Sequence, residues 1–355
     1  MSPPHEPVLI AGAGPIGLAC AISARRHMTG GDGGAGTEAG PYIIDAGAIA
    51  NSIMHYPVGM TFFTTPERLE IGSHPLVTSG AKPTREEALM YYRGVVRAEG
   101  LRVRTYTRLS DVRRENGRLV AELVTGIGEL TPMHVSCERL VLATGYFEHP
   151  NRLDVPGEDL PHVSHYPEEA HRTAGLDIVV VGAKNSAVEM ALSSYRAGAR
   201  VTLVHRDAGL RPSVKYWLSP DLLNRIKAGE IAARWNTTIQ EIRPREVVVR
   251  RESGELERLP ADRVYLLTGY HPDFDLFRRI GLQLDPETGR PEHDPETLET
   301  TIPGIYLAGS ITSGKYISEI FIENGRYDGE KIFGDPASRT RARELFGAIN
   351  RPIGE

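Results

Sequence analysis

A glycine-rich turn near the start of the chain limits the possible folds more than any other feature. Residues 8–14 read VLIAGAG, an apolar run that is typical of a buried strand ending in glycines. The turn is a complete G-x-G-x-x-G, and an apolar helical pattern follows it to about His27. The first glycine permits the tight turn, the second lets a pyrophosphate approach, and the third lets the helix lie close to the strand. We therefore predict a dinucleotide-binding βαβ unit with contacts from Gly12, Gly14, Pro15, Ile16 and Gly17.

A second short strand, YIID at residues 42–45, supplies the acidic residue that such a unit needs. Asp45 ends this strand, where its carboxylate would accept hydrogen bonds from ribose hydroxyls. The spacing exceeds the usual ~20 residues. A half-glycine segment at 29–40, expected to be an exposed flexible loop, accounts for the excess. Asp45 and the adjacent Ala46 are therefore candidate cofactor-binding residues.

The length and composition exclude several classes of protein. A chain of 355 residues favours two domains, and its net charge of −5 gives no basic surface for nucleic acid or anionic membrane. Neither a membrane-spanning apolar stretch nor an N-terminal signal pattern is evident. Cys20 and Cys137 are too few for a disulfide framework, and their spacing fits no metal site. We expect a cytoplasmic enzyme that forms a homo-oligomer and acts on a small molecule.

The plan of the first 145 residues then repeats. Antiparallel strands expected over 103–135 precede RLVLATG at 139–145, and those over 230–258 precede RVYLLTG at 263–269. DIVVVGAKNSA at 177–187 starts the second copy, and GIYLAGS at 304–310 returns to the first. We predict an α/β fold of two Rossmann-like, three-layer modules, the second inserted in the first. The boundaries would be 1–157 and 271–355 for one module and 158–270 for the other, with a final amphipathic helix over 319–333.

The second turn departs from the usual pattern at one position. Gly182 and Ala187 occupy the first and third places of the fingerprint, but Lys184 stands where the middle glycine is expected. We hypothesise that this side chain points away from the turn and places its ammonium against nucleotide phosphates. Asn185 and Ser186 complete the candidate binding turn.

Several phrases in chain order resemble the flavoproteins with two dinucleotide-binding domains, which include thioredoxin-reductase-like enzymes and flavin monooxygenases. The phrases are ATG at 143–145, VPG at 155–157, the second fingerprint and GIYLAGS. The resemblance implies FAD on the first module and a nicotinamide dinucleotide on the second. It adds Thr144, Gly145, Gly269 and Gly309 as candidates, and Ser310 at the place of the usual flavin-ribityl acid.

Longer phrases narrow the resemblance to the bacillithiol disulfide reductase family. They are NSIMHYPVGMTFFTTPERLEIG at 51–72, KPTREEALMYYR at 82–93, GAKNSA at 182–187, YWLSPDLLNRIKAGEI at 216–231 and GKYISEIFIENGR at 314–326. The family implies NADPH reducing FAD, and electrons passing to the disulfide of a low-molecular-weight thiol. Many members carry a proposed redox cysteine at the place of Ile16, and no C-x-x-C is present either. We expect both cysteines to be buried structural thiols and assign no catalytic residue.

Further candidates follow from the same resemblance. His205, Arg206 and Arg211 resemble a run that grips the 2′-phosphate of NADPH, although Asp207 could pair with one of the arginines. Glu319 and Ile320 lie near the start of the expected last helix, whose N-terminus would face the flavin. Thr61 lies in a segment expected along the flavin, with Phe62 or Phe63 as ring neighbours or core residues, and Arg108 is a last candidate.

Alternatives to a disulfide reductase remain open at this point. A flavin monooxygenase is one, since His162 and Tyr166 have the spacing of H-x-x-x-Y-P. An electron transferase to a ferredoxin-like partner needs no active cysteine and so fits Ile16 best. A non-enzymatic NADPH-binding redox sensor would also fit the absent thiol.

Overall fold

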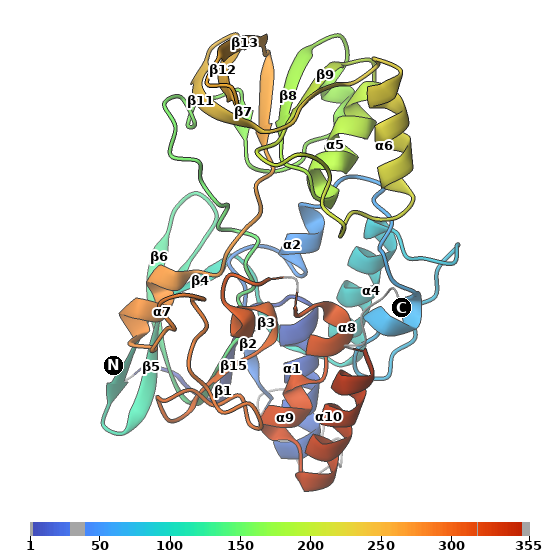
Figure 1. Cartoon of the computed structure of the whole chain (residues 1–355). Helices are drawn as coiled ribbons and strands as arrows, with labels where there is room; N and C mark the ends of the chain where they lie inside the picture. Colours follow the sequence, from blue (N-terminus) through green and yellow to red (C-terminus); the bar gives the residue numbers. More distant parts are fainter. Residues whose placement is uncertain (1–2, 29–39, 318, 350–355) are drawn as a thin grey trace. The chain divides into compact units, whose positions relative to one another are not determined.

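The computed structural model describes residues 3–28, 40–317 and 319–349, and it divides into two compact units (Figure 1). Unit 1 contains Met1–Met54, Thr64–His149 and Tyr270–Glu355, and unit 2 contains His55–Phe63 and Pro150–Gly269. Nearly all of the predicted loop at 29–40 lies outside the described residues. The cofactor-based boundaries at 157/158 and 270/271 stay a prediction.

Unit 1 is built on a parallel sheet that carries the first glycine turn at the end of its central strand. In the order β3-β2-β1-β6 with β15 beyond β6, its strands are Arg102–Arg104, Tyr42–Ile44, His5–Ala11, Thr131–Leu142 and Ile305–Leu307. The return of β15 to this sheet confirms that the C-terminal part of the chain completes the first module. Helix α1, Pro15–Met28, follows β1 directly, and its residues 17–24 are buried on all sides, because small and apolar residues dominate it.

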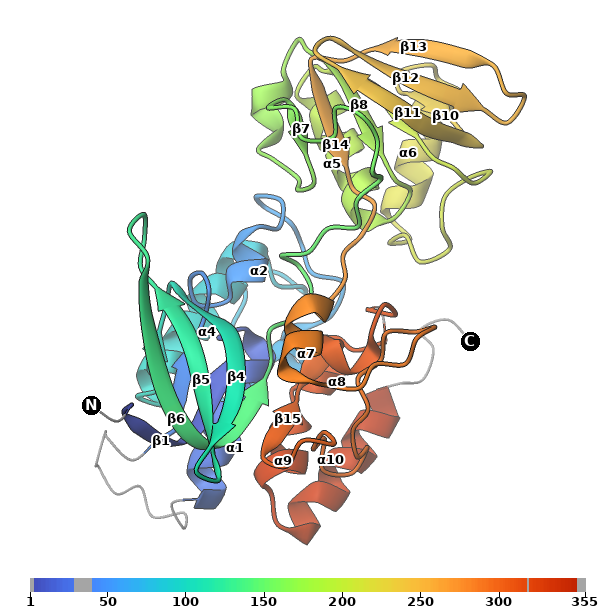
Figure 2. The ribbon, with the colours of Figure 1, turned by 90° about the vertical axis from the view of Figure 1, so that its left-hand side faces the viewer.

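The expected antiparallel strands are present, but one of them is longer than the sequence indicates. β4 (Thr107–Glu115) pairs with β5 (Arg118–Thr125), and β5 pairs with the first half of β6 (Figure 2). The second half of β6 pairs in parallel with β1. RLVL at 139–142 is therefore the end of one twelve-residue strand and not a separate element, and ATG at 143–145 is the turn that follows it. This continuity fixes the turn after β6 beside the turn after β1.

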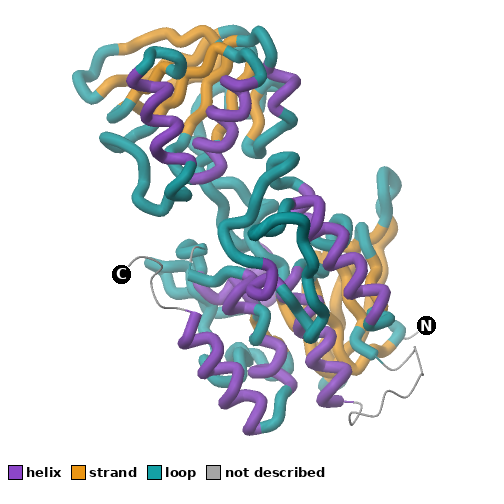
Figure 3. The backbone as a smooth tube through the Cα atoms, turned by 90° about the vertical axis from the view of Figure 1, so that its right-hand side faces the viewer, coloured by secondary structure: helices purple, strands orange, loops and turns teal. Residues whose placement is uncertain are grey.

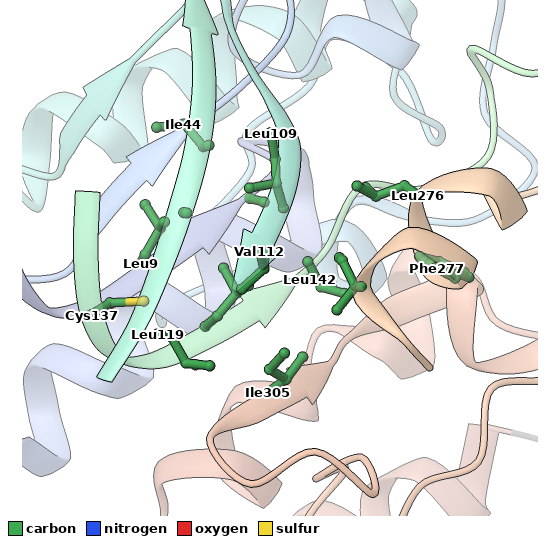
Figure 4. Close-up of a cluster of buried hydrophobic side chains, with 14 of the residues drawn as sticks. Leu9, Ile44, Leu109, Val112, Leu119, Cys137, Leu142, Leu276, Phe277 and Ile305 are labelled. Carbon is green, nitrogen blue, oxygen red and sulfur yellow. The ribbon is translucent and has the colours of Figure 1, made fainter. Parts of the chain in front are cut away.

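The core of unit 1 lies between this sheet and the segment that follows residue 270. Leu9, Ile44 and Leu142 from the sheet point into the same cluster as Leu109 of β4 and Phe277 of α7, Phe274–Ile280 (Figure 4). Each of these side chains is buried. Burial of a large apolar side chain contributes roughly 1.5–3 kcal/mol, so the cluster holds strands from distant parts of the sequence together.

The remaining helices of unit 1 are partly as expected. The predicted helix at 83–100 is α4, Arg85–Ala98, which begins at a capping box between Thr84 and Glu87. Short helices α2 (Asn51–Met54) and α3 (Pro66–Leu69) precede it. No helix of the described part of the chain is long and apolar enough to cross a membrane.

The prediction of a single helix over 319–333 was wrong. The structure has α8 at Ile322–Gly325 and α9 at Asp328–Phe333, followed by α10 at Pro336–Ile349, which the sequence analysis did not predict. Asn324 and Gly325 are weak helix formers, and the Asn324 side chain bonds backbone groups of Phe321 and Glu319 instead. The apolar periodicity of the sequence continues across this break between α8 and α9, so it did not reveal the break.

Unit 2 repeats the plan of unit 1 with its own core (Figure 3). Its parallel sheet has the order β10-β9-β8-β14-β7, with strands Ala232–Arg234, Arg200–Val204, Asp177–Val181, Arg263–Leu266 and Val163–Ser164. Helices α5 (Asn185–Arg196) and α6 (Leu218–Lys227) cover one face. The predicted antiparallel strands are β11 (Thr237–Arg243), β12 (Glu246–Arg251) and β13 (Leu256–Pro260). The α/β fold with two Rossmann-like modules is confirmed.

Candidate functional site

The first glycine turn has the backbone geometry that a dinucleotide requires. Gly12 has φ of +119°, and a Cβ there would collide with the carbonyl oxygen of Ala143. A Cβ at Gly17 would collide with the carbonyl oxygen of Gly12, so the helix lies against the turn. A Cβ at Gly14 would meet no atom within 4 Å. Packing thus requires the outer two glycines, whereas the middle one leaves the backbone open to a ligand.

Asp45 is tied to this turn from the neighbouring strand. Its carboxylate accepts hydrogen bonds from the backbone N–H of Ala13 at 2.7 Å and of Gly47 at 2.8 Å. Burial raises the pKa of the Asp45 carboxyl, and these two hydrogen bonds act in the opposite direction. Each oxygen keeps a second lone pair, which can accept from a ribose hydroxyl.

A pocket in unit 1 brings together six of the predicted residues: Gly12, Asp45, Ala46, Arg108, Thr144 and Gly145. Thr144 follows β6, and its buried Oγ1 has no hydrogen-bond partner among the described residues. Such an orphaned hydroxyl is uncommon in a protein interior and indicates that a ligand completes its hydrogen bonding. Together with the open backbone at Gly14, it shows that the residues present fit a dinucleotide such as FAD.

Three titratable lining residues of the pocket were not foreseen: Glu148, His149 and Asp273. Glu148 pairs with Arg108 at 2.9 Å, and His149 Nε2 lies 3.6 Å from an Asp273 oxygen. Asp273 also caps α7 by accepting from the N–H of Leu276. The capping pattern at 273–276 was the available signal for Asp273, while Glu148 and His149 carry no motif.

The Gly309–Ser310 turn lies beside Ile16 rather than in that pocket. Gly309 has φ of +78° and donates its N–H to the buried carboxylate of Asp328 at 2.8 Å. A Cβ at Gly309 would lie 2.7 Å from Ile16 Cδ1, and one at Gly325 would lie 2.6 Å from the same atom. Ser310 is itself buried. Ile16 thus fills a space bounded by two glycines.

Glu319 and Ile320 do not occupy the start of a long helix. They lie just before α8, which begins at Ile322 and has four residues, so the helix that starts here is much shorter than expected. Both carboxylate oxygens of Glu319 accept from Arg290, at 2.7 and 2.6 Å. The assignment of these two residues to the flavin site stays a prediction.

Both cysteines are buried, and burial raises the pKa of each thiol. Burial raises the pKa of the Cys20 thiol well above its ordinary value, and the carboxylates of Asp328 and Glu330 raise it further. Burial raises the pKa of Cys137 to about 12. A thiol with so high a pKa supplies almost no thiolate at neutral pH. The expectation of two structural thiols is confirmed.

The second glycine turn, in unit 2, keeps the tight backbone of the first. Gly182 has φ of +132°, and a Cβ there would lie 2.5 Å from the carbonyl oxygen of Leu267 and 3.1 Å from Ala187 Cβ. Lys184 is the exposed residue preceding α5, with an extended backbone and no capping hydrogen bond from its side chain. Its side chain is thus accessible to a ligand at the helix N-terminus.

Asn185 fastens a neighbouring loop to this turn. Its Oδ1 accepts from the backbone N–H of Lys215 at 2.8 Å, and its Nδ2 donates to the carbonyl of Ser213 at 3.3 Å. The N–H of Arg211 donates to the carbonyl of Ala183 at 3.2 Å. Ser186, the other candidate here, lies within α5, partly exposed. The loop that follows β9 therefore lies along the turn.

The basic residues after β9 are close together, and one is already paired. Asp207 lies 2.6 Å from an Arg211 nitrogen and 3.3 Å from His205 Nε2. Burial lowers the pKa of His205, and Asp207 opposes that shift. Arg206 is exposed. Arg206 is thus the more accessible arginine of the predicted phosphate site, because Asp207 competes for Arg211.

The last two candidates, Gly269 and Thr61, also lie in unit 2. The carbonyl of Gly269, a residue with φ of +95°, accepts from the N–H of Asn151 at 2.9 Å. The carbonyl of Thr61 accepts from Lys215 Nζ at 3.1 Å. Phe62 is buried, and Phe63 stacks on Trp217 with ring centroids 5.8 Å apart.

Comparison with known proteins gives the family. The profile of the pyridine nucleotide-disulphide oxidoreductases matches residues 9–309. Bacilliredoxin reductase Bdr of Bacillus subtilis (strain 168) is 38% identical over 335 residues, which are 94% of this chain and 98% of that protein.

Two solved structures agree along almost the whole chain. Bacillithiol disulfide reductase Bdr (YpdA) from Bacillus cereus superposes with a TM-score of 0.86 at 37% identity, over 96% of this chain and 99% of that one. The enzyme of the same name from Staphylococcus aureus gives 0.84 at 32% identity, over 96% and 99%. The chain therefore belongs to the pyridine nucleotide-disulphide oxidoreductases, in the family of Bdr, and is a flavin-dependent oxidoreductase that uses FAD and a nicotinamide dinucleotide.

Proposed function

We propose that this enzyme uses NADPH to reduce the disulfide of a low-molecular-weight thiol, with bacillithiol disulfide as the substrate. The observation that carries the proposal is the pair of strand–glycine–helix turns, one in each unit of a chain of the Bdr family. Unit 1 would hold FAD and unit 2 would hold NADPH. The relatives named for bacillithiol disulfide cover nearly the whole chain, which supports the choice of substrate.

The residues of unit 1 bind and orient the flavin cofactor. The open backbone at Gly14 and the N-terminus of α1 would receive the pyrophosphate, and Asp45 would accept from the ribose. Thr144 would make the hydrogen bond that its buried hydroxyl lacks. When bound, FAD supplies two-electron chemistry, accepting hydride and passing electrons to a disulfide.

The residues of unit 2 bind and select the nicotinamide cofactor. The N-terminus of α5 and the ammonium of Lys184 favour a pyrophosphate, and Arg206 with Arg211 favours a 2′-phosphate. The net reaction is NADPH + H⁺ + RSSR → NADP⁺ + 2 RSH. NADPH is oxidised by loss of a hydride, the S–S bond breaks, and two electrons with two protons yield the two thiols.

A second candidate is electron transfer to a ferredoxin-like partner. It is favoured by Ile16, which packs against Gly309 and Gly325 at the position of the family's proposed redox cysteine. Together with the raised pKa values of both cysteines, this disfavours a reactive thiol in the described part of the chain.

We also propose that the protein forms a homo-oligomer, as expected from the sequence.

A pair of variants tests the assignment of the cofactors. Thr144→Val removes the orphaned hydroxyl at constant shape, so FAD should bind the apoprotein about tenfold more weakly, with unchanged or slightly higher stability of the apoprotein. Arg206→Ala should weaken NADPH about tenfold while NADH binding changes little. Flavin fluorescence and cofactor titrations measure both effects. Normal FAD affinity in Thr144→Val, or equal losses for NADPH and NADH in Arg206→Ala, would contradict the respective assignment.

A further inference from the structure

Residues 55–63 belong to unit 2, although the chain on both sides of them belongs to unit 1. We call this segment the strap. It leaves unit 1 after Met54, at the end of α2, and returns at Thr64, just before α3. By its contacts it belongs to unit 2. Whatever fastens the strap therefore acts on a stretch of chain that is covalently continuous with the FAD module at both ends.

Polar and aromatic contacts hold the strap within unit 2, among them the ring contact of His55 with Tyr166 at 6.2 Å. Lys215 Nζ donates to the carbonyl oxygen of Thr61 at 3.1 Å. Next to it, Phe63 stacks on Trp217 at 5.8 Å with the ring planes 16° apart. Lys215 and Trp217 are two residues apart in the loop before α6, so the same short stretch makes both contacts.

The ammonium of Lys215 is an unusual group to find at such a place. Its side chain is 9% exposed, and its Nζ lies 2.5 Å from a carboxylate oxygen of Glu189 in α5, whose side chain is 16% exposed. Both side chains are mostly buried, and removing two charges from water has a large free-energy cost that their attraction must offset. A buried ion pair of this kind adds little net stability to the fold. The ammonium also holds the carbonyl oxygen of Thr61 in the strap.

The backbone of the same lysine is fixed to the dinucleotide turn. Its N–H donates to Asn185 Oδ1, and Asn185 is the first residue of α5. Lys215 therefore joins the turn predicted to receive NADPH, through its main chain, to the strap, through its ammonium. Glu189, one turn further along α5, fixes the direction of the side chain.

We propose that Lys215 is a positioning residue for hydride transfer, because it fastens the strap to the helix that begins at the NADPH-binding turn. The proposal rests on the proposed function, in which NADPH reduces FAD. Hydride transfer requires near-contact of donor and acceptor, and misplacement by about 1 Å can cost on the order of a hundredfold in rate. A fastened strap restricts the arrangements that the two modules sample, whereas NADPH affinity itself depends on other residues.

The test compares Lys215 variants in the FAD-loaded, full-length enzyme. Lys215→Met removes the ammonium, and Lys215→Met/Glu189→Met removes the whole pair, so that no unpaired buried charge destabilises the fold. Lys215→Arg keeps the charge and can donate again. Lys227→Met, at an exposed lysine at the end of α6, is the matched control.

Two readouts are needed. Hydrogen–deuterium exchange of residues 55–63 should accelerate about tenfold in both Met variants at Lys215, because a hydrogen bond from a charged donor is lost. Bleaching of the flavin by saturating NADPH in a single turnover should slow about tenfold, with the dissociation constant of NADPH unchanged within a factor of two. Lys215→Arg should recover much of both, and Lys227→Met should match the wild type.

The outcomes separate this proposal from the proposed function. Unchanged exchange at 55–63, or an unchanged bleaching rate in the double variant, would overturn the role of Lys215. A fall in NADPH affinity with a normal bleaching rate would make Lys215 a binding residue and would also overturn it. A wild-type flavin that NADPH fails to bleach would contradict the proposed function instead.

Discussion

At the scale of single residues, Lys184 shows how a side chain can stand at the place of a fingerprint glycine. The turn around it is as tight as the glycine turn of unit 1, yet Lys184 is exposed and directly precedes α5. Its Cβ therefore does not obstruct the turn. We interpret the lysine as replacing close approach of the backbone by a charge contact with the phosphates.

Lys184→Ala should weaken NADPH binding about tenfold, since a phosphate would lose one charge-assisted contact. FAD content should stay at the wild-type level, because the residue belongs to the other unit. Isothermal titration with NADPH and the flavin-to-protein absorbance ratio measure the two effects. An unchanged NADPH affinity would remove Lys184 from the site.

The Cys20 thiol is not expected to be required for disulfide reduction. Burial and the carboxylates of Asp328 and Glu330 raise the pKa of its thiol, which disfavours the thiolate that a nucleophile requires. Cys20→Ala should retain disulfide reduction within about a factor of two. A thiol-reactive dye should label neither Cys20 nor Cys137 in the native enzyme and both after unfolding. Loss of turnover in Cys20→Ala at full FAD content would show that the electrons pass through this sulfur.

At the scale of elements, the close packing of α9 on α1 supports the Gly309 turn. A Cβ at Gly329 of α9 would lie 2.8 Å from Cys20 Cα, 2.9 Å from Ser23 Cβ and 3.1 Å from Ala19 O. The next residue, Glu330, accepts a hydrogen bond from Ser23 Oγ and pairs with His27. One residue before Gly329, Asp328 holds the N–H of Gly309. The distance between the two helices therefore fixes the Gly309–Ser310 turn.

Gly329→Ala should destabilise the fold by about 1–3 kcal/mol, because the added methyl has no room between the helices. Gly94→Ala is the control, since Gly94 is exposed in the middle of α4 and a Cβ there meets no atom within 4 Å. That variant should gain roughly 0.5–1 kcal/mol from helix propensity. Urea unfolding of the two variants measures the difference, and equal effects would contradict the close packing.

The elements also show why part of the site could be predicted and part could not. Glycine turns such as 12–17 are local, because the backbone conformation and the adjoining strand and helix are encoded in neighbouring residues. The pairing of Asp207 with Arg211 was open in the sequence, since short-range ion pairs depend on side-chain conformation. Glu148 and Asp273 line one pocket from segments far apart in the chain, a contact that no local pattern encodes. The break between α8 and α9 was missed because apolar periodicity continues across it.

At the scale of the whole molecule, the same order of strands and helices occurs in both units. β1, α1 and β2 in unit 1 correspond to β8, α5 and β9 in unit 2, and each unit adds a three-stranded antiparallel section. Each unit has its own buried core. Two cofactor sites in one chain follow from this repetition, and the order of electron flow, NADPH to FAD to disulfide, follows from the chemistry of the cofactors.

Rapid-mixing reoxidation of the NADPH-reduced enzyme tests this account most directly. The reduced enzyme is mixed in separate experiments with bacillithiol disulfide, dioxygen and a ferredoxin, and the flavin absorbance is followed. The account predicts that bacillithiol disulfide restores the oxidised spectrum fastest, with two thiols formed per NADPH consumed. Fast reoxidation by ferredoxin or dioxygen, with the disulfide inert, would contradict it.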